Sequence, residues 1–306
     1  QGTPGMDKKE LLKSIIKNKA TLIDYENIRD RKMARYLGFG RFAGIVGCFN
    51  TLNLFLAHNE FVTLGRAYKI NNYERLKNNL RNVIFPKIKL LVTGDGRVAN
   101  GVIELLKETN ITQVNKDQYL HSDINKPVFC NLQTSDYVQH TNKNTFDLSH
   151  FINHPREYSS CALPYLKVTD VFISAHYWDP ASPKIFEKNQ LNQLPKLQVI
   201  GDITCDLEGS IPTTIKSTSI ENPNFYIDKK NMKEVKNKKN NLGIMAVDNL
   251  PAELPRDSSL EFGDGIVNHV LPFLIENDDG RILNATITKE GHFLEKYSYL
   301  NNYLNS

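Results

Sequence analysis

Short apolar runs, each closed by glycine or by polar residues, recur along the chain. Residues 87–93 form such a run and are followed by Gly94. A run of this length without polar alternation is typical of a strand buried on both faces in a parallel sheet. Apolar residues then recur at helical spacing over residues 98–107, and a second apolar run follows at residues 111–114. The pattern therefore predicts a strand–helix–strand unit.

Three later apolar runs, at residues 171–175, 198–203 and 242–247, have the same character. Each ends in polar or turn-forming residues, and for any one of them an ordinary turn is an equally good explanation. The carboxyl ends of parallel strands meet at one edge of a sheet, and ligands bind there. Taken together, the runs predict an α/β fold, with a Rossmann-like parallel sheet, helices on both faces and a ligand crevice at one edge.

The pattern in the rest of the chain is less regular. The expected elements are a helix at residues 7–18, a strand at 20–24 and a polar helix at 25–35. Residues 44–59 read as an apolar helix in which Gly44 and Gly47 let another helix approach. The remaining expectations are a helix-leaning connector at 60–85, an irregular excursion at 120–150, a helix at 260–275 capped by Asp257 or Ser258, and a short strand at 285–288.

A glycine-rich motif joins the first strand to its helix. Residues 94–99 read G-D-G-R-V-A and fit the pattern G-x-G-x-x-A. Gly94 permits a tight turn, Gly96 lets a pyrophosphate approach the backbone, and Ala99 lets the helix pack closely. Unpaired N–H groups at the helix start attract phosphates. Asn115 lies about 20 residues further on, at the ribose-contacting position. The alternative is a glycine-rich turn that binds nothing.

Composition excludes several classes of protein. The chain has 306 residues and a net charge of +4, which is too small to indicate nucleic-acid binding. Its cysteines are scattered and form no Cys-x-x-Cys pair, so we expect neither a disulfide framework nor a structural zinc. We therefore expect the protein to work in a reducing compartment. No apolar run reaches about 18 residues, so no membrane span is expected. The cysteines are Cys48, Cys130, Cys161 and Cys205.

Two polar features have simple explanations. His140, His150 and His154 lack the spacing of metal ligands on a helix, so we interpret them as solvated loop histidines and predict no metal. Residues 229–241 are rich in Lys and Asn but contain no aromatic residue, which favours a solvated loop or hairpin tip over a nucleic-acid site.

The beginning of the chain is unusual. Five residues, 1–5, precede Met6 and resemble the scar of a protease site before an engineered start. The alternative is that the chain begins inside a longer protein.

Several stretches, taken in order, resemble the saccharopine dehydrogenase family. The likeness is closest to the lysine–ketoglutarate reductase half of the bifunctional lysine-degrading enzyme, and more distant to alanine dehydrogenase and transhydrogenase. It runs from about residue 8 to residue 299. The stretches that carry it are residues 21–26, 38–44, 94–99, 154–158, 177–178, 202–211 and 248–255.

The resemblance implies two Rossmann-like domains flanking a cleft, with the cofactor domain inserted into the other. The expected divisions are 1–37, a remnant of the substrate domain; 38–257, the dinucleotide-binding domain; and 258–306, which returns to the first. The implied reaction reduces the imine of lysine and 2-oxoglutarate to saccharopine with NADH or NADPH, or runs in reverse. Partners are these small molecules, with homo-oligomerisation left open. The compartment is the cytoplasm, or the mitochondrial matrix in a eukaryote.

The resemblance also implies which residues bind. Those expected on the substrate are Arg35, Phe39, Thr204, Cys205 and Asp206. Those expected on the cofactor are Gly94, Gly96, Arg97, Val98, Asn115, Tyr177, Ile203, Val247, Asp248, Asn249 and Leu250.

Two departures from the family pattern matter. The proton-transferring lysine and histidine of the family lie upstream of anything in this chain, so we expect the chain to lack its main acid–base residues. The ribose position holds Asn115 rather than an acid, which leaves NADP open beside NAD. Two other functions are therefore kept: a related amino-acid dehydrogenase acting on a smaller 2-oxo acid, and a dinucleotide-binding module without catalysis.

Overall fold

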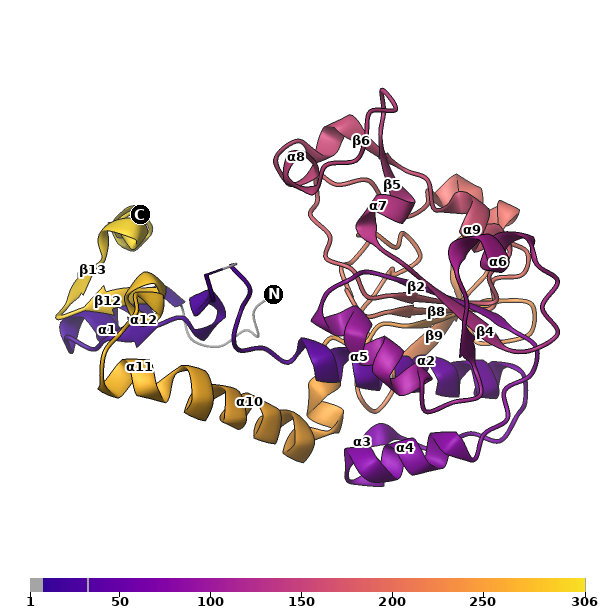
Figure 1. Ribbon diagram of the computed structural model, residues 1–306, viewed down its shortest axis with the longest axis horizontal. Coiled ribbons are helices and arrows are strands. Elements are labelled where there is room, and N and C mark those ends of the chain that lie inside the picture. Colours follow the sequence, from indigo (N-terminus) through magenta and orange to yellow (C-terminus); the bar gives the residue numbers. More distant parts are fainter. Residues whose placement is uncertain (1–7, 32, 306) are drawn as a thin grey trace. The chain divides into compact units, whose positions relative to one another are not determined.

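The computed structural model describes residues 8–31 and 33–305, and the chain divides into two compact units (Figure 1). The smaller unit joins Gln1–Gly38 to Ser259–Ser306, and the larger is Phe39–Ser258. Both divisions lie one residue from the boundaries drawn from the sequence. Residues 1–5 and Met6, interpreted as a tag scar and a start, lie outside the described residues.

An eight-stranded sheet forms the centre of the larger unit, in the order β10-β9-β11-β8-β7-β2-β4-β3. The pairs from β3 to β11 are parallel, while β9 and β10 are antiparallel additions. The strands are β2 (Lys89–Thr93), β3 (Thr112–Gln113), β4 (Val128–Leu132), β7 (Val171–Ser174), β8 (Val199–Asp202), β9 (Asn224–Ile227), β10 (Glu234–Val235) and β11 (Leu242–Met245).

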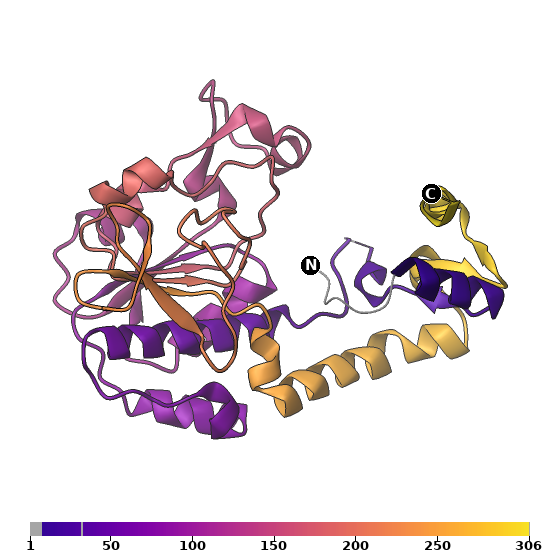
Figure 2. The same cartoon turned by 180° about the vertical axis from the view of Figure 1, so that it is seen from behind.

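Helices cover both faces of this sheet, so the predicted α/β, Rossmann-like fold class is confirmed. One face carries α2 (Gly40–His58) and α5 (Arg97–Leu106); Figure 2 shows α2 beneath the sheet from behind. The opposite face carries α6 (Lys116–His121), α7 (Thr134–Tyr137) and α9 (Leu163–Lys167). Beside α2 lie α3 (Ala67–Ile70) and α4 (Tyr73–Arg81).

The expectation of an irregular excursion at residues 120–150 is wrong. This segment contains β4, which pairs residue for residue with β2 and lies between β2 and the edge strand β3. Asn131 interrupts its apolar pattern, and the side chains of Cys130 and Leu132 are buried only because tertiary neighbours cover both faces. Chain order is therefore not sheet order: the second strand of the motif, β3, lies at the edge, and the third, β4, lies beside β2.

Two helices of the larger unit meet through glycine. A Cβ atom on Gly44 would overlap the carbonyl oxygen of Val98, and one on Gly101 would overlap that of Arg41. The backbones of α2 and α5 are therefore in direct contact, as the sequence predicted for Gly44. A Cβ on Gly47 would lie 2.6 Å from the side chain of Ile203, in the loop after β8, and 3.2 Å from that of Leu250, which begins the 3-10 helix η4 (Leu250–Glu253).

The smaller unit contains a three-stranded sheet of order β1-β12-β13, with strands β1 (Leu22–Ile23), β12 (Thr286–Lys289) and β13 (His292–Phe293). The expected helix at 25–35 is instead one short turn, η1 (Tyr25–Asn27), followed by a bridge between Arg29 and Arg35. The other helices are α1 (Lys8–Lys17), α12 (Arg281–Ala285) and α13 (Leu300–Asn305).

The helix expected at 260–275 is two helices, α10 (Pro255–His269) and α11 (Leu271–Ile275). Neither predicted cap is the start of α10. The hydroxyl of Ser258 donates to the carbonyl oxygens of Pro251 and Pro255. The carboxylate of Asp257 accepts the N–H of Tyr73. Throughout the described ranges, each helix is too short or too polar to cross a membrane.

The glycine contact between α2 and α5 generates a stability prediction. We expect Gly44→Ala to lower the free energy of unfolding of the larger unit by about 1–3 kcal/mol, because the added methyl forces the helices apart. The control is Gly263→Ala in α10, where a Cβ meets no described atom within 4 Å. That change should stabilise slightly, by up to about 1 kcal/mol, through helix propensity. Urea unfolding measures both, and a Gly44→Ala protein as stable as wild type would contradict the account.

Candidate functional site

The glycine-rich turn leaves the sheet directly after β2. Gly94 has φ +118°, a conformation that L side chains rarely adopt, and its N–H donates to the carbonyl oxygen of Leu132 at 2.9 Å. A Cβ on Gly94 would lie 2.5 Å from the carbonyl oxygen of Ala175. Both backbone conformation and space therefore require glycine here, at the point where β2, β4 and β7 end.

The second glycine opens the start of α5. Gly96 is the N-cap of that helix, and a Cβ placed on it meets none of the described atoms within 4 Å. Asp95 and Arg97 beside it are exposed, and Ala99 is buried against the sheet. The unpaired N–H groups of the first turn and the helix dipole favour an anion at this place. The space above Gly96 fits the approach of a pyrophosphate.

The other parallel strands end at the same edge. Thr93 pairs with Ser174, Ser174 pairs with Asp202, and Gly201 pairs with Met245, so β2, β7, β8 and β11 finish at the same level. The structure thus brings to one edge the following sequence-predicted residues: Gly94, Gly96, Arg97, Val98, Tyr177, Ile203, Thr204, Cys205, Asp206, Val247, Asp248, Asn249 and Leu250.

The side chains of these residues differ in their exposure to solvent. Tyr177 is 90% exposed, and Asp248 and Asn249 are exposed. Val247 and Leu250 are buried in the hydrophobic core between the sheet and α2. A ligand at this edge could therefore meet the side chains of the first three residues, whereas Val247 and Leu250 could offer it backbone atoms.

A buried carboxylate anchors the loop after β8. Asp202 is fully buried and accepts the hydroxyl of Thr204 at 2.5 Å and that of Thr214 at 2.6 Å. Burial raises the pKa of its carboxyl group. The hydroxyls tie both ends of the loop to one buried group, so the residues between them are held at the sheet edge.

Cys205 lies in this loop with a strained backbone, at φ +60°. Its thiol donates to the carbonyl oxygen of Ala246 at 2.8 Å, and burial raises its pKa to about 12. Burial therefore disfavours the thiolate, which is the reactive form of a nucleophilic cysteine.

The two remaining substrate candidates belong to different units. Arg35 belongs to the smaller unit, where its guanidinium is 3.1 Å from the carboxylate of Glu26. Phe39 begins the larger unit as the N-cap of α2 and is 36% exposed. Both are accessible to a ligand.

Asn115, predicted as the ribose contact, has a structural role at the start of a helix. Asn115 is the N-cap of α6, and its side chain accepts the N–H of Gln118 at 2.9 Å in a capping box. In the described sheet β3 pairs with β4, so one strand separates Asn115 from β2. The spacing rule behind the Asn115 prediction assumes that the second strand of the motif lies beside the first, whereas here β4 lies between β3 and β2.

Sequence reasoning missed His176 as a site residue. It follows β7, is buried, and its Nδ1 lies 2.8 Å from the Thr93 hydroxyl. Its Nε2 is buried without a partner among the described residues. Burial lowers the pKa of His176 to about 4, so the ring is neutral at physiological pH. Its position directly after an apolar strand was the signal that could have revealed it.

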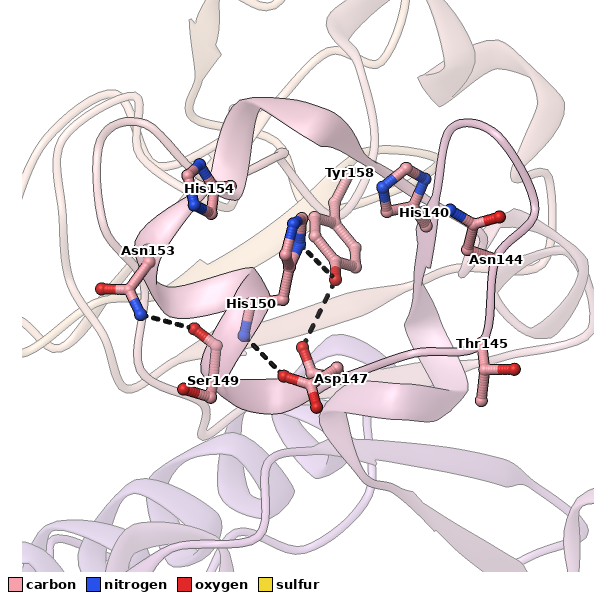
Figure 3. Close-up of a pocket in the computed structure, with 9 residues that line it drawn as sticks. All are labelled: His140, Asn144, Thr145, Asp147, Ser149, His150, Asn153, His154 and Tyr158. Atoms are coloured by element: carbon pink, nitrogen blue, oxygen red, sulfur yellow. Dashed lines mark hydrogen bonds between the residues drawn. The ribbon is translucent and has the colours of Figure 1, made fainter.

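The three histidines interpreted as solvated loop residues are instead a cluster, so that interpretation is wrong for the buried His140. They line a pocket of about 570 Å³ formed by β5 (Val138–His140), α8 (Leu148–Asn153) and β6 (Tyr158–Ser160), and Figure 3 shows it. His150 Nδ1 lies 3.1 Å from the Tyr158 hydroxyl, and ligand atoms of His140, His150 and Glu157 lie within 4.8 Å of one another.

Hydrogen bonding in this pocket favours a structural cluster over a metal site. The N–H of Asn142 donates to His140 Nδ1 at 3.1 Å. In a neutral ring the proton is then on Nε2, which faces Glu157 Oε2 at 3.5 Å. A metal on Nε2 would require that proton to move to Nδ1, where it would oppose the N–H of Asn142.

Comparison with known proteins bears on this site. No family model matches the chain. It is 26% identical over 345 residues to the mitochondrial alpha-aminoadipic semialdehyde synthase of Mus musculus, covering 95% of this chain and 37% of the relative. The Arabidopsis thaliana synthase is 28% identical over 339 residues, covering 95% of this chain and 31% of the relative. The chain thus spans about a third of the length of these relatives.

Solved structures show the same fold. An L-alanine dehydrogenase matches 96% of this chain and 72% of its own length, with a TM-score of 0.55 and 14% identity. The transhydrogenase from Sinorhizobium meliloti matches 94% and 72%, with a TM-score of 0.50 and 12% identity. The predicted resemblance to the bifunctional lysine-degrading enzyme, and more distantly to alanine dehydrogenase and transhydrogenase, is confirmed.

The buried His176 generates a prediction on pH. The unfolded ring titrates near 6.5 and the folded ring near 4, so acidification protonates the unfolded chain first and favours unfolding. Between pH 7 and pH 5 the wild type should lose about 2 kcal/mol more stability than His176→Asn. Urea unfolding at both pH values measures this loss. The matched control is His154→Asn at an exposed histidine, and a wild-type pH dependence in His176→Asn would refute the burial argument.

Proposed function

We propose that the chain is the dinucleotide-binding part of an NAD(P)-dependent oxidoreductase of lysine metabolism. The reaction would reduce the imine of lysine and 2-oxoglutarate to saccharopine, or run in reverse. The observation that carries this proposal is the turn Gly94–Gly96 at the N-terminus of α5, at the same edge of the sheet as the ends of β7, β8 and β11. The similarity over 95% of the chain to alpha-aminoadipic semialdehyde synthases supports it.

The cofactor, NAD or NADP, would supply the hydride. Its pyrophosphate would lie on the unpaired N–H groups at the start of α5, where Gly96 leaves room and Arg97 adds positive charge. The exposed ring of Tyr177 would offer a face to one of the bases or to the nicotinamide. Asp248 and Asn249 would lie near the nicotinamide end, together with backbone atoms of Val247 and Leu250.

The substrate side would lie after β8. Thr204, Cys205 and Asp206 would line it, held in place by the buried carboxylate of Asp202. Arg35 would bind a substrate carboxylate, since its fork of N–H groups matches carboxylate oxygens and its present partner, Glu26, is half-exposed. Phe39, exposed at the N-cap of α2, would offer its ring to an apolar part of a substrate.

The polar side chains at the strand ends are poor candidates for proton transfer. Imine formation and hydrolysis need general acids and bases, which contribute typically 10²–10⁴-fold. His176 is buried and neutral, Cys205 is a neutral thiol, and Asp202 is committed to hydroxyl groups. We therefore assign this role to general acids and bases other than these three groups.

The partners proposed are small molecules: lysine, 2-oxoglutarate and saccharopine. Relatives carry the word mitochondrial in their names, which makes the mitochondrial matrix one candidate compartment, beside the cytoplasm.

Cofactor binding tests the function most directly. We expect NADH or NADPH to bind the chain saturably in a nucleotide-fluorescence titration, and Gly96→Val to weaken that binding at least about tenfold, or 1.4 kcal/mol. The valine side chain would occupy the place of the pyrophosphate, while the open space above Gly96 leaves the fold unstrained.

Gly263→Val, at an open glycine of α10, is the control for a general effect of the substitution. If Gly96→Val binds the nucleotide as tightly as the wild type, the turn does not bind the pyrophosphate. If the wild type binds neither NADH nor NADPH, the proposed cofactor is wrong.

A further inference from the structure

A cavity in the smaller unit is lined by described residues that the sequence did not predict to bind a ligand. Its volume is about 590 Å³, and each of these lining residues belongs to the smaller unit. Three segments form its walls: η1 with the turn after it, α12, and the short helix η5 (Glu295–Tyr297). The dinucleotide site proposed above belongs to the larger unit, so the cavity is a separate feature of the chain.

A buried tyrosine holds these segments together. The hydroxyl of Tyr297 donates to the carbonyl oxygen of Asn284 at 3.3 Å and accepts the side-chain amide of Asn27 at 3.4 Å. The same carbonyl oxygen accepts the ammonium group of Lys296 at 3.3 Å. Asn27 and Tyr297 are 270 positions apart in the sequence, so the cavity is a product of the fold and not of a single loop.

A tight turn fixes one cationic side chain at the cavity. The N–H of Asp30 donates to the carbonyl oxygen of Ala34 at 2.9 Å, and the carboxylate of Asp30 accepts the N–H of Ala34 at 2.8 Å. Met33, inside the turn, has φ +65°, and its carbonyl oxygen accepts the guanidinium group of Arg29 at 3.2 Å. The guanidinium group of Arg29 has several further N–H groups that can serve a ligand.

Positive charge prevails around the cavity. The charged residues that line it are three cations and one acid: Arg29, Arg281, Lys296 and Asp30. Arg281 is paired with Asp279, whose carboxylate lies 2.7 Å from the guanidinium group. Within the described ranges, Arg29 and Lys296 form no ion pair, and each donates instead to a carbonyl oxygen. Arg31 lines an adjoining cavity that shares Arg29. A concave site lined mainly by one sign of charge attracts counter-ions, so an anion is favoured here.

We propose that this cavity binds a phosphate group, either inorganic phosphate or the phosphate of a small organic molecule. A phosphate monoester carries about −1.5 to −2 charges at pH 7 and presents three acceptor oxygens. These oxygens can accept both from the fork of Arg29 and from the ammonium group of Lys296, which come from opposite ends of the chain. A carboxylate has a smaller charge and only two oxygens, so it would satisfy fewer of these donors.

The size of the cavity favours an organic phosphate. A volume of about 590 Å³ is typical of sites for small organic molecules. Met33, which is 67% exposed, lines the same cavity and offers an apolar contact. We therefore expect a phosphate monoester to bind more tightly than inorganic phosphate.

Isothermal titration calorimetry of the full chain tests this inference with two probes, inorganic phosphate and phenyl phosphate. We expect both to bind saturably and phenyl phosphate to bind more tightly; equal affinities would assign the cavity to inorganic phosphate. Arg29→Gln and Lys296→Gln should each weaken binding about tenfold or more, because each removes a charged donor. Arg29→Lys keeps the charge and should retain part of the affinity.

The matched control is Lys289→Gln, at an exposed lysine of β12 in the same unit, and its phosphate affinity should equal that of the wild type. Gly96→Val fills the space at the start of α5, the other place that favours phosphate, and should leave phosphate binding in the cavity unchanged. NADH binding should be the same in Arg29→Gln as in the wild type, so this inference and the proposed function fail separately.

Four outcomes would overturn the inference. The first is a wild type that binds neither probe saturably, and the second is unchanged affinity in both Arg29→Gln and Lys296→Gln. The third is an equal loss in Lys289→Gln, which would mean that only the overall charge attracts phosphate. The fourth is loss of phosphate binding in Gly96→Val, which would assign the phosphate to the glycine-rich turn.

Discussion

The backbone contact between α2 and α5 is the constraint on which the rest of the larger unit depends. Gly44 and Gly101 let the two helices touch without side chains between them. At the same time α2 packs on β8 and β11, where Gly201 accommodates Thr51 and Gly47 accommodates Ile203. One helix thereby holds α5 against the sheet, and the start of α5 lies at the same edge as the ends of the parallel strands.

Buried polar groups then hold the loops at that edge. Asp202 binds two threonine hydroxyls, and neutral His176 binds Thr93 under the glycine-rich turn. Burying a polar group costs free energy unless a hydrogen-bond partner replaces the lost water. Here the partners are present, and the hydrogen bonds fix the positions of the loops. The result is an edge whose loops are anchored by buried groups and whose exposed side chains include those of Asp95 and Tyr177.

Elements with a local sequence signature were predicted, whereas arrangements that depend on contacts between distant segments were missed. The unit from β2 to α5 was predicted because strand, turn and helix each have a signature within a few residues, and the ends of β7, β8 and β11 followed from the same rule. Sheet order depends on pairing between distant segments, so β4 and its position beside β2 were missed. The cluster around His140 was missed because its members come together through a hairpin, not through helical spacing.

Hydrogen–deuterium exchange of the chain with and without saturating NADH tests whether the strand ends form the dinucleotide site. We expect slower exchange at the carboxyl edge, in residues 94–98, 176–178, 203–206 and 247–250. We expect no change at residues 115–121 or in the histidine pocket at 138–158. Protection confined to that pocket, or spread evenly over the larger unit without enrichment at the glycine-rich turn, would contradict the assignment of the strand ends as the dinucleotide site.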